Sequence, residues 1–157
     1  FSKFEGNLYA FVLADVELRV NNSEFSQGSA IFFLARIMLF QFFQNKVLDI
    51  HCLSAFQEGC VFRIANTLDA KISLCHFRNL SGNVKGGVFF VEFSILEVLY
   101  CDIKNLSFSD SSEMLLWGKT MNFKGDYLTV EGYASNLISL EESLGSISNS
   151  NFDTNQG

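Results

Sequence analysis

One phrase returns along this chain: a Phe, a few turn-forming residues, a Gly, and then a burst of apolar residues. It occupies residues 25–33, 56–62 and 77–90, and it begins once more at 152–157. Self-similarity at a period of roughly 20–50 residues indicates a repeat architecture, in which each unit is one small supersecondary element. The phrase therefore predicts a chain built by stacking similar units rather than one folded around a single irregular core.

The Phe that opens each phrase serves as a register mark. Phe4 precedes Phe25 by 21 residues, Phe56 precedes Phe77 by 21, and Ile103 follows Phe77 by 26. The last match is supported by its surroundings, because residues 77–81 (FRNLS) correspond to 103–107 (IKNLS). At the same offset, 88–91 (VFFV) falls on 114–117 (MLLW).

The composition favours strands for these units. The chain of 157 residues contains eighteen Phe and no Pro; Phe suits a pleated, half-buried surface, while Pro is excluded from central strands. Each unit contains short apolar or alternating segments of strand length separated by turn residues. We therefore expect an all-β parallel β-helix, a solenoid of about six rungs, in which each rung buries its apolar face only against its neighbours.

In such a stack the register residues lie above one another at about 4.8 Å spacing. We predict one interior ladder, with the Gly residues supplying positive φ or close backbone approach at the corners. The predicted ladder consists of Phe25, Phe56, Phe77, Ile103 and Phe152.

Two stretches fit this scheme less well. Phe43 lies 18 residues after Phe25 and 13 before Phe56, so either it belongs inside one 31-residue rung or the sequence is incomplete there; we favour the long rung. Residues 110–117 carry a capping-box pattern typical of a helix start, Asp110 with Glu113. The match to the unit at 88–91 favours a strand instead.

The units resemble the repeats of pectin-lyase-like right-handed parallel β-helix proteins. The residues that carry this resemblance run Phe-x-Asn-x-Ser, then Gly-Gly-Val-Phe-Phe, then Ile-Leu-x-Val and a new Phe/Ile-x-Asn, from Phe77 to Asn105. The pattern is most similar to polymorphic outer-membrane-type repeats and to very large surface proteins of ciliates and other protists. The resemblance implies a right-handed solenoid and a surface, adhesive or matrix role; another branch of the family consists of polysaccharide lyases and hydrolases.

Charge and hydropathy exclude some functions. The net charge is −6 and the eleven Lys and Arg residues are scattered, whereas a nucleic-acid surface needs clustered basic residues. The longest apolar stretch, 29–43, is interrupted by Arg36 and Gln41 and is shorter than the roughly 20 residues of a membrane helix. We expect no nucleic acid partner and no membrane insertion, and we expect residues 1–157 to be one open-ended segment of a longer chain.

Three Asn-x-Ser sequons begin at Asn21, Asn79 and Asn105. Asn and Ser are ordinary turn residues, so the pattern can arise by chance. However, Asn79 and Asn105 occupy the same place in successive units, where a turn faces solvent. We therefore consider N-linked glycans stacked along one edge, as expected for a secreted eukaryotic protein.

The four cysteines, Cys52, Cys60, Cys75 and Cys101, match no zinc-binding spacing. Cys75 and Cys101 are 26 residues apart and each precedes a register residue by two. Stacked neighbours on parallel strands point the same way, so we expect this pair to be buried thiols rather than a disulfide. The spacing predicts no geometry for Cys52 and Cys60.

Groups that could perform chemistry do not recur at the repeat spacing. Glu141 and Glu142 are adjacent and should point to opposite faces of a strand, and Asp126 with Lys124 forms the nearest mixed pair. His51 and His76 have no acid or nucleophile at a recurring offset. No cofactor or metal motif is present, and we expect no catalytic residues.

The leading hypothesis is a structural or adhesive segment of a large extracellular or cell-surface protein. Its ends would join further rungs of the same chain or another copy end to end, which would make a fibril. The alternative is a polysaccharide-active enzyme or carbohydrate-binding module, with Trp117 and Tyr127 as candidate sugar-stacking residues. A receptor-like ectodomain is a third possibility.

Overall fold

The described part of the chain is made almost entirely of short strands. The structure, a computed structural model, describes residues 1–6, 8–13, 15–28, 30–52, 58–109, 113–133 and 136–154. These residues form nineteen strands and no helix. Consequently none of them belongs to a helix long and apolar enough to cross a membrane.

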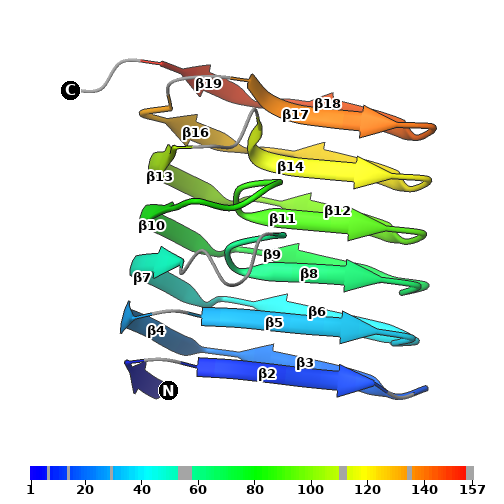
Figure 1. The fold of residues 1–157 in the computed structure, drawn as a ribbon, viewed down its shortest axis with the longest axis horizontal. Coiled ribbons are helices and arrows are strands. Elements are labelled where there is room, and N and C mark those ends of the chain that lie inside the picture. Colours follow the sequence, from blue (N-terminus) through cyan, green and yellow to red (C-terminus); the bar gives the residue numbers. More distant parts are fainter. Residues whose placement is uncertain are drawn as a thin grey trace.

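The strands lie in three parallel sheets, and each coil of the chain contributes one strand to each sheet (Figure 1). The first sheet contains β1 (Ser2–Glu5), β4 (Ser23–Gly28), β7 (Lys46–Cys52), β10 (His76–Gly82), β13 (Asp102–Phe108), β16 (Thr129–Glu131) and β19 (Asn151–Asp153). The second contains β2 (Leu8–Leu13), β5 (Ala30–Ala35), β8 (Phe62–Ala65), β11 (Phe89–Glu92), β14 (Glu113–Lys119) and β17 (Asn136–Glu141). The third contains β3 (Glu17–Asn21), β6 (Leu39–Phe43), β9 (Ala70–Ser73), β12 (Ile95–Leu99), β15 (Asn122–Asp126) and β18 (Leu144–Ser148).

The strand order confirms a parallel β-solenoid. Each strand pairs in parallel with the strands three places before and after it, as β7 does with β4 and β10. Among the described residues the coils therefore form six successive triplets, and β19 begins a seventh. Figure 1 shows them stacked from β1–β3 at the bottom to β17–β19 at the top.

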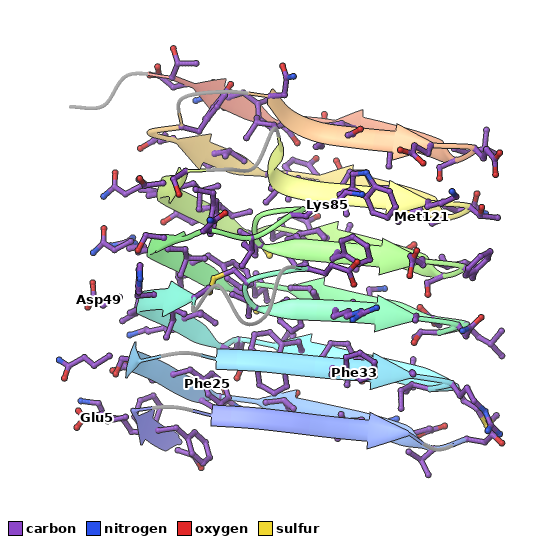
Figure 2. All side chains as sticks on the ribbon, in the orientation of Figure 1. Glu5, Phe25, Phe33, Asp49, Lys85 and Met121 are labelled. Atoms are coloured by element: carbon purple, nitrogen blue, oxygen red, sulfur yellow. A yellow bond between two sulfur atoms is a disulfide. The ribbon has the colours of Figure 1, made fainter. Side chains whose placement is uncertain are left out.

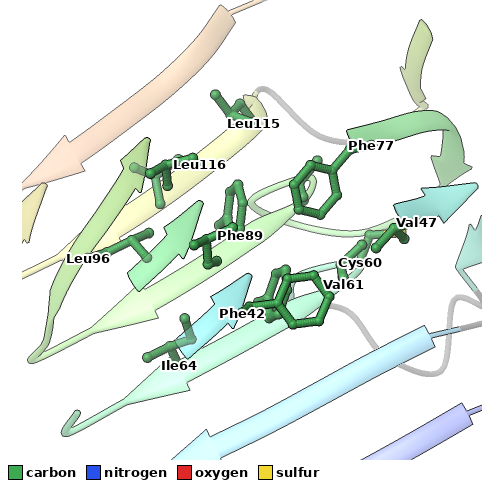
Figure 3. Packing of buried hydrophobic residues seen from close by; sticks show 14 of the residues in the cluster. Phe42, Val47, Cys60, Val61, Ile64, Phe77, Phe89, Leu96, Leu115 and Leu116 are labelled. Carbon is green, nitrogen blue, oxygen red and sulfur yellow. The ribbon is translucent and has the colours of Figure 1, made fainter. Parts of the chain in front are cut away.

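The interior is a set of aligned apolar columns, one or two from each sheet. In the second sheet Phe32, Phe62 and Phe89 lie in register, with ring centroids 5.4 and 5.3 Å apart and nearly parallel planes. Phe42 from the third sheet meets Phe62 edge to face at 5.0 Å. Figure 3 shows Phe42, Phe77 and Phe89 converging from three different strands. Stacking and T-shaped contacts of this kind add to the energy of simple burial, and they explain why the chain carries so many Phe residues.

The register residues of the first sheet form one column. The column runs Phe4, Phe25, Val47, Phe77, Ile103, Val130 and Phe152. It thus brings together Phe25, Phe77, Ile103 and Phe152 of the predicted ladder, whereas Phe56 lies outside the described residues.

Val47 occupies the place between Phe25 and Phe77, so the preferred 31-residue rung from Phe25 to Phe56 is wrong. The strand that carries Val47, β7, contains no Phe, so a register mark based on Phe passed over it. Phe43 lies in β6 of the third sheet, where it pairs with Asn21 and Ser73. The extra length belongs to the following coil, between the end of β7 at Cys52 and the start of β8 at Phe62.

Of the predicted strand at 110–117, residues 113–117 are strand and residues 110–112 lie outside the described residues. The predicted alignment was one residue off. Phe89 pairs with Leu116 and Phe90 with Trp117, which is an offset of 27, whereas β10 and β13 pair at 26. The connection leading into β14 therefore contains one more residue than the one leading into β11. Because strand side chains alternate, a shift of one residue exchanges inward and outward positions.

Most corners are formed by residues other than Gly. Fifteen described non-glycine residues have φ near +50°, in three sets that recur from coil to coil. One set lies between the second and third sheets, here called the Phe93 corner: Arg36, Asn66, Phe93, Thr120 and Glu142. Another lies between the third and first sheets, here called the Tyr100 corner: Asn22, Gln44, Leu74, Tyr100, Tyr127 and Asn149. The third, here called the asparagine bend, lies within the first sheet: Gln27, Asp49, Asn79 and Asn105.

The glycines of the repeated phrase serve the remaining connection, from the first to the second sheet. Gly86 has φ of +79°, a conformation that favours glycine. Gly28 has no room for a Cβ, because that atom would overlap the backbone of Gly6 on the preceding coil. Both predicted roles of Gly, positive φ and close approach, are confirmed at this connection, and Gly132, with φ of +70°, takes the asparagine-bend position next to Asn105.

Candidate functional site

Two of the three sequons lie in the asparagine bend. Nδ2 of Asn105 donates to Oδ1 of Asn79 at 2.9 Å, and Nδ2 of Asn79 donates to Oδ1 of Asp49 at 2.7 Å. Asp49 projects from the outer margin of the first sheet in Figure 2. Asn79 and Asn105 are exposed, as predicted, but they lie at a bend within β10 and β13 and not in a turn between strands. The atoms that glycosylation would modify are therefore the donors that connect successive coils.

The third sequon lies elsewhere. Asn21 ends β3 in the third sheet and is exposed, while Ser23 of the same sequon is buried. The backbone amide of Ser23 donates to Oδ1 of Asn45 at 2.8 Å, and the hydroxyl of Ser23 donates to the carbonyl of Asn21. The structure thus separates Asn21 from the other two sequon asparagines by a sheet corner.

The cysteines divide into one disulfide and two thiols. Cys52 and Cys60 form a disulfide with Cα atoms 5.5 Å apart, so the end of β7 is tied to the segment that enters β8. Cys75 and Cys101 are free and buried, which confirms the predicted thiol pair. The hydrogen bond between these thiols and their burial raise the pKa of Cys101, so this thiol stays protonated and unreactive.

An aromatic and cationic column follows the outer face of the second sheet. Phe33, Arg63, Phe90 and Trp117 occupy equivalent positions on successive strands. The Arg63 guanidinium lies 5.1 Å from the Phe33 ring and 5.6 Å from that of Phe90, and Phe90 stacks on Trp117 at 4.5 Å. Nζ of Lys85 lies 3.8 Å from the centre of the Trp117 ring. Figure 2 shows Phe33 and Lys85 on this same face.

The position of Trp117 in this column determines whether its ring is accessible to a ligand. Trp117 is only 5 % exposed, because the segment bearing Lys85 covers it, so it does not form an open sugar-stacking surface. The corrected register of β14 placed Trp117 beside Phe90, and the sequence alignment at the shorter offset could not have found this pair.

Tyr127 is exposed and forms a pair with Tyr100 at the Tyr100 corner. The two rings are stacked with centroids 4.7 Å apart and planes within 6°. Next to Tyr127, Asp126 accepts hydrogen bonds from Nδ2 of Asn149 and Oγ of Ser148, both at 2.9 Å. These two donors hold the pKa of Asp126 below its usual value, so this carboxylate is ionised near neutral pH.

The remaining candidate groups are held in separate pairs along the coils. Glu141 pairs with Lys119 at 3.6 Å, and Glu142 accepts a hydrogen bond from Oγ1 of Thr120 at 3.5 Å. His51 lies 3.0 Å from Oγ of Ser81. These contacts join neighbouring coils, and they do not bring a carboxylate pair together around one point.

A charged cluster at the outer face of the first sheet centres on Asp102. Its carboxylate contacts Arg78 at 2.9 Å, Lys104 at 3.5 Å and the His76 ring at 3.5 Å. Burial alone would raise the pKa of Asp102, but the hydrogen bond from Arg78 and the charge of Lys104 outweigh it and lower this pKa. Within the described ranges no group of three or more His, Cys, Asp and Glu side chains could hold a metal ion.

A hollow with a volume of about 490 Å³ lies at the Phe93 corner. Its walls are mostly apolar and come from four successive coils, through Leu68, Phe93, Ile95, Met121 and Leu144. Sequence reasoning missed this hollow, because its residues lie at a corner whose left-handed backbone is not marked by any one residue type. A regular series of exposed apolar residues at the start of the third-sheet strands was the available signal.

The candidate residues described above lie at separate places on the solenoid, and their arrangement is not typical of one enzyme family. The structure shows a parallel β-solenoid with three parallel sheets, and it does not assign the chain to a family. Comparison with protein-family models, with curated proteins and with solved structures found no match.

Proposed function

We propose that this chain is a structural or adhesive β-solenoid of the cell exterior whose end coils are continued by further coils of the same kind. The observation that carries the proposal is the single column of register residues in the first sheet. Its lowest described member, Phe4, is 45 % exposed although it stacks on Phe25 at 5.1 Å. Its highest described member, Phe152, is half-buried.

The two end coils present matching strand edges. Among the described strands β1 pairs only with β4, and β19 only with β16. A coil added beyond either end would extend all three sheets in register and would bury Phe4 or Phe152 against another column residue. Such continuation, within one polypeptide or between copies, relates different surfaces and therefore yields a linear assembly rather than a closed dimer.

Two features support an exterior location. The Cys52–Cys60 disulfide is a bond that persists in oxidising compartments and is rare in the cytosol. The exposed sequon asparagines, Asn21, Asn79 and Asn105, agree with a secreted eukaryotic protein. The finer likeness, to polymorphic outer-membrane-type repeats and large protist surface proteins, belongs to this proposal as well.

Assembly between copies can be tested with one charge at each end. Phe4→Asp should block the lower edge and Phe152→Asp the upper edge, because a carboxylate would replace the stacked ring at the junction. We expect linear particles of the unmodified chain in negative-stain electron microscopy and short ones for either variant. Leu74→Asp, at an exposed side position, is the control and should still assemble.

Mixing the two blocked variants gives the sharpest outcome. Each variant keeps one intact edge, and these two edges are complementary, so end-to-end growth in the mixture should stop after one junction. A monomeric unmodified chain at high concentration, or linear particles that persist in both variants, would contradict the proposal.

Carbohydrate binding is the second candidate, and the exposed Tyr100–Tyr127 pair favours it. Aromatic rings beside an ionised carboxylate such as Asp126 are groups that can contact a sugar. Retention on polysaccharide matrices that Tyr127→Ala abolishes would support binding. Turnover of plant or algal polysaccharides by the purified chain would favour an enzyme instead.

A further inference from the structure

Exposed apolar side chains gather at the Phe93 corner. One outward column contains one residue from each of five successive coils: Met38, Leu68, Ile95, Asn122 and Leu144. The backbone amide of each of the last four donates a hydrogen bond to the residue just before the column member of the preceding coil. Met38 is 52 % exposed, Leu68 68 %, Ile95 45 % and Leu144 73 %. Phe93, at 55 %, lies in the adjoining column of left-handed residues.

This clustering is unusual for a surface. Isolated exposed apolar residues need no explanation, but contiguous apolar patches mark interaction sites. Here the patch is a row with one side chain per coil, apolar except at Asn122, and the hollow of about 490 Å³ lies along it from Leu68 to Leu144. A matching partner must present apolar groups at the same repeat of about 4.8 Å, and the same corner of a second copy does so from Met38 to Leu144.

The charges beside the ridge determine the orientation of that partner. In the column of left-handed residues Arg36 lies two coils below Phe93, and Glu142 lies two coils above it. A two-fold axis through the Phe93 coil, perpendicular to the solenoid, makes the two copies antiparallel. It places Arg36 of each copy opposite Glu142 of the other. The column of left-handed residues then faces the same column of the other copy, and the outward column likewise faces its equivalent.

The same axis also lays the outward column on its own counterpart, with Leu68 facing Asn122. Met38 lies two coils below Ile95, and Leu144 lies two coils above it, so Met38 faces Leu144 across the axis and Ile95 faces its own copy. A parallel arrangement would instead place the charged column against the apolar one. We propose that the Phe93 corner is an interface at which two copies of this chain pair side by side and antiparallel.

This pairing does not depend on the proposed end-to-end continuation, because it uses a side of the solenoid. In the single chain Arg36 forms an ion pair with Asp15 at 3.2 Å, and both side chains are well exposed. In the proposed dimer Glu142 of the other copy replaces Asp15 or joins it. Exposed pairs of this kind contribute little to stability, so the exchange has a small cost. The interface is isologous, as closed dimers are.

The test is the mass of the full chain by sedimentation equilibrium, made on the Phe4→Asp background so that end-to-end growth cannot contribute. Phe93→Asp should raise the Kd of the dimer by roughly tenfold or more, as loss of a central anchor does. Leu74→Asp is the matched control, since Leu74 is also exposed and left-handed, with φ of 53° against 48° for Phe93. It should leave the dimer unchanged.

Two further variants test the orientation. Arg36→Glu should weaken pairing, and Arg36→Glu with Glu142→Arg should recover most of it, because the exchanged charges again face each other. Ile95→Cys should give a cross-linked dimer under mild oxidation, and Leu74→Cys should not. A monomeric parent chain, equal effects of Phe93→Asp and Leu74→Asp, or a monomer that binds phospholipid vesicles through this corner would each overturn the proposal.

Discussion

The Asn105 side chain donates a hydrogen bond to that of Asn79, and the Asn79 side chain donates one to that of Asp49. These side chains join three successive coils, and all three residues have backbone φ near +55°. Asn and Asp tolerate this left-handed conformation better than other residues with a Cβ. The bend in the first sheet therefore depends on both backbone conformation and side-chain hydrogen bonding.

The two contributions can be separated at Asn79. Asn79→Ala should lower the free energy of unfolding by about 1–3 kcal/mol, because it loses two hydrogen bonds and places Ala in a left-handed position. Asn79→Gly loses the same hydrogen bonds but accepts the backbone conformation, so it should cost less. Urea unfolding of both variants measures the difference, and equal losses would contradict the role of backbone conformation.

The sequons lead to a prediction about glycan occupancy. Asn79 and Asn105 lie on adjacent coils about 4.8 Å apart, and their Nδ2 atoms are ladder donors. Two glycans there would crowd each other and remove donors. We expect a secretory host to modify Asn21 and at most one of the other two, measured as the mass lost on enzymatic deglycosylation. Full occupancy of both Asn79 and Asn105 would refute this expectation.

The fold was predictable because a solenoid repeats its signal. The match of 77–81 to 103–107 gave the true register of β10 and β13. Phe alone was a poorer guide, because Val47 and Val130 occupy the same column as Phe77. A column needs an apolar side chain of suitable volume, and either Val or Phe satisfies that requirement.

The surface features were less predictable for a physical reason. Corners with φ near +50° accept Asn22, Leu74 and Tyr100 alike, since stacking with neighbouring coils holds the backbone in place. The hollow depends on which residues follow the Phe93 corner. The Trp117–Phe90 stack depends on the length of the connection that leads into β14. One inserted residue, as before β14, changes these neighbours without disturbing the apolar pattern of the strand.

Asp102 predicts a dependence of stability on pH. Its pKa in the folded protein is lowered, after the opposing effect of burial, by Arg78 and Lys104. Its stabilising contribution is therefore complete above the unfolded pKa of about 3.9 and is lost as the pH falls through the folded value. Urea midpoints should fall in this acid range for the parent chain.

Asp102→Asn is the matched variant for this dependence. It should be less stable than the parent near neutral pH and should lose less stability on acidification, because the titrating group is gone. Identical pH profiles for the two proteins would show that other carboxylates govern acid unfolding.

Leu74 predicts a stabilising substitution. It has φ of 53° and is 44 % exposed, so a β-carbon-bearing apolar side chain occupies a conformation that Asn adopts more easily. Leu74→Asn should raise the free energy of unfolding by about 0.5–1 kcal/mol. Leu99→Asn, in the regular strand β12, is the control and should destabilise, since Asn is disfavoured in strands. Stabilisation of neither variant in thermal unfolding would count against strain at this corner.

The cysteines predict two different responses to thiol reagents. Cys52 and Cys60 close a short loop with a sequence separation of 8, and such a disulfide contributes about 2–3 kcal/mol to stability in the chain-entropy description. Replacing both by Ser should cost about that amount. The native chain should show no thiol that reacts with an alkylating reagent, because Cys75 and Cys101 are buried, and two after unfolding without reductant.

Reduction of that disulfide should also be visible at Trp117, the one Trp of the chain. The segment after Cys52 is joined to the one that covers Trp117, since the Gly59 amide donates to the Lys85 carbonyl at 2.8 Å and Lys85 lies over the indole. Loosening Gly59 should expose the ring, shift its emission to longer wavelength and increase quenching by acrylamide. Cys75→Ala with Cys101→Ala should leave this response intact, whereas an unchanged emission on reduction would show that Lys85 is held independently of the disulfide.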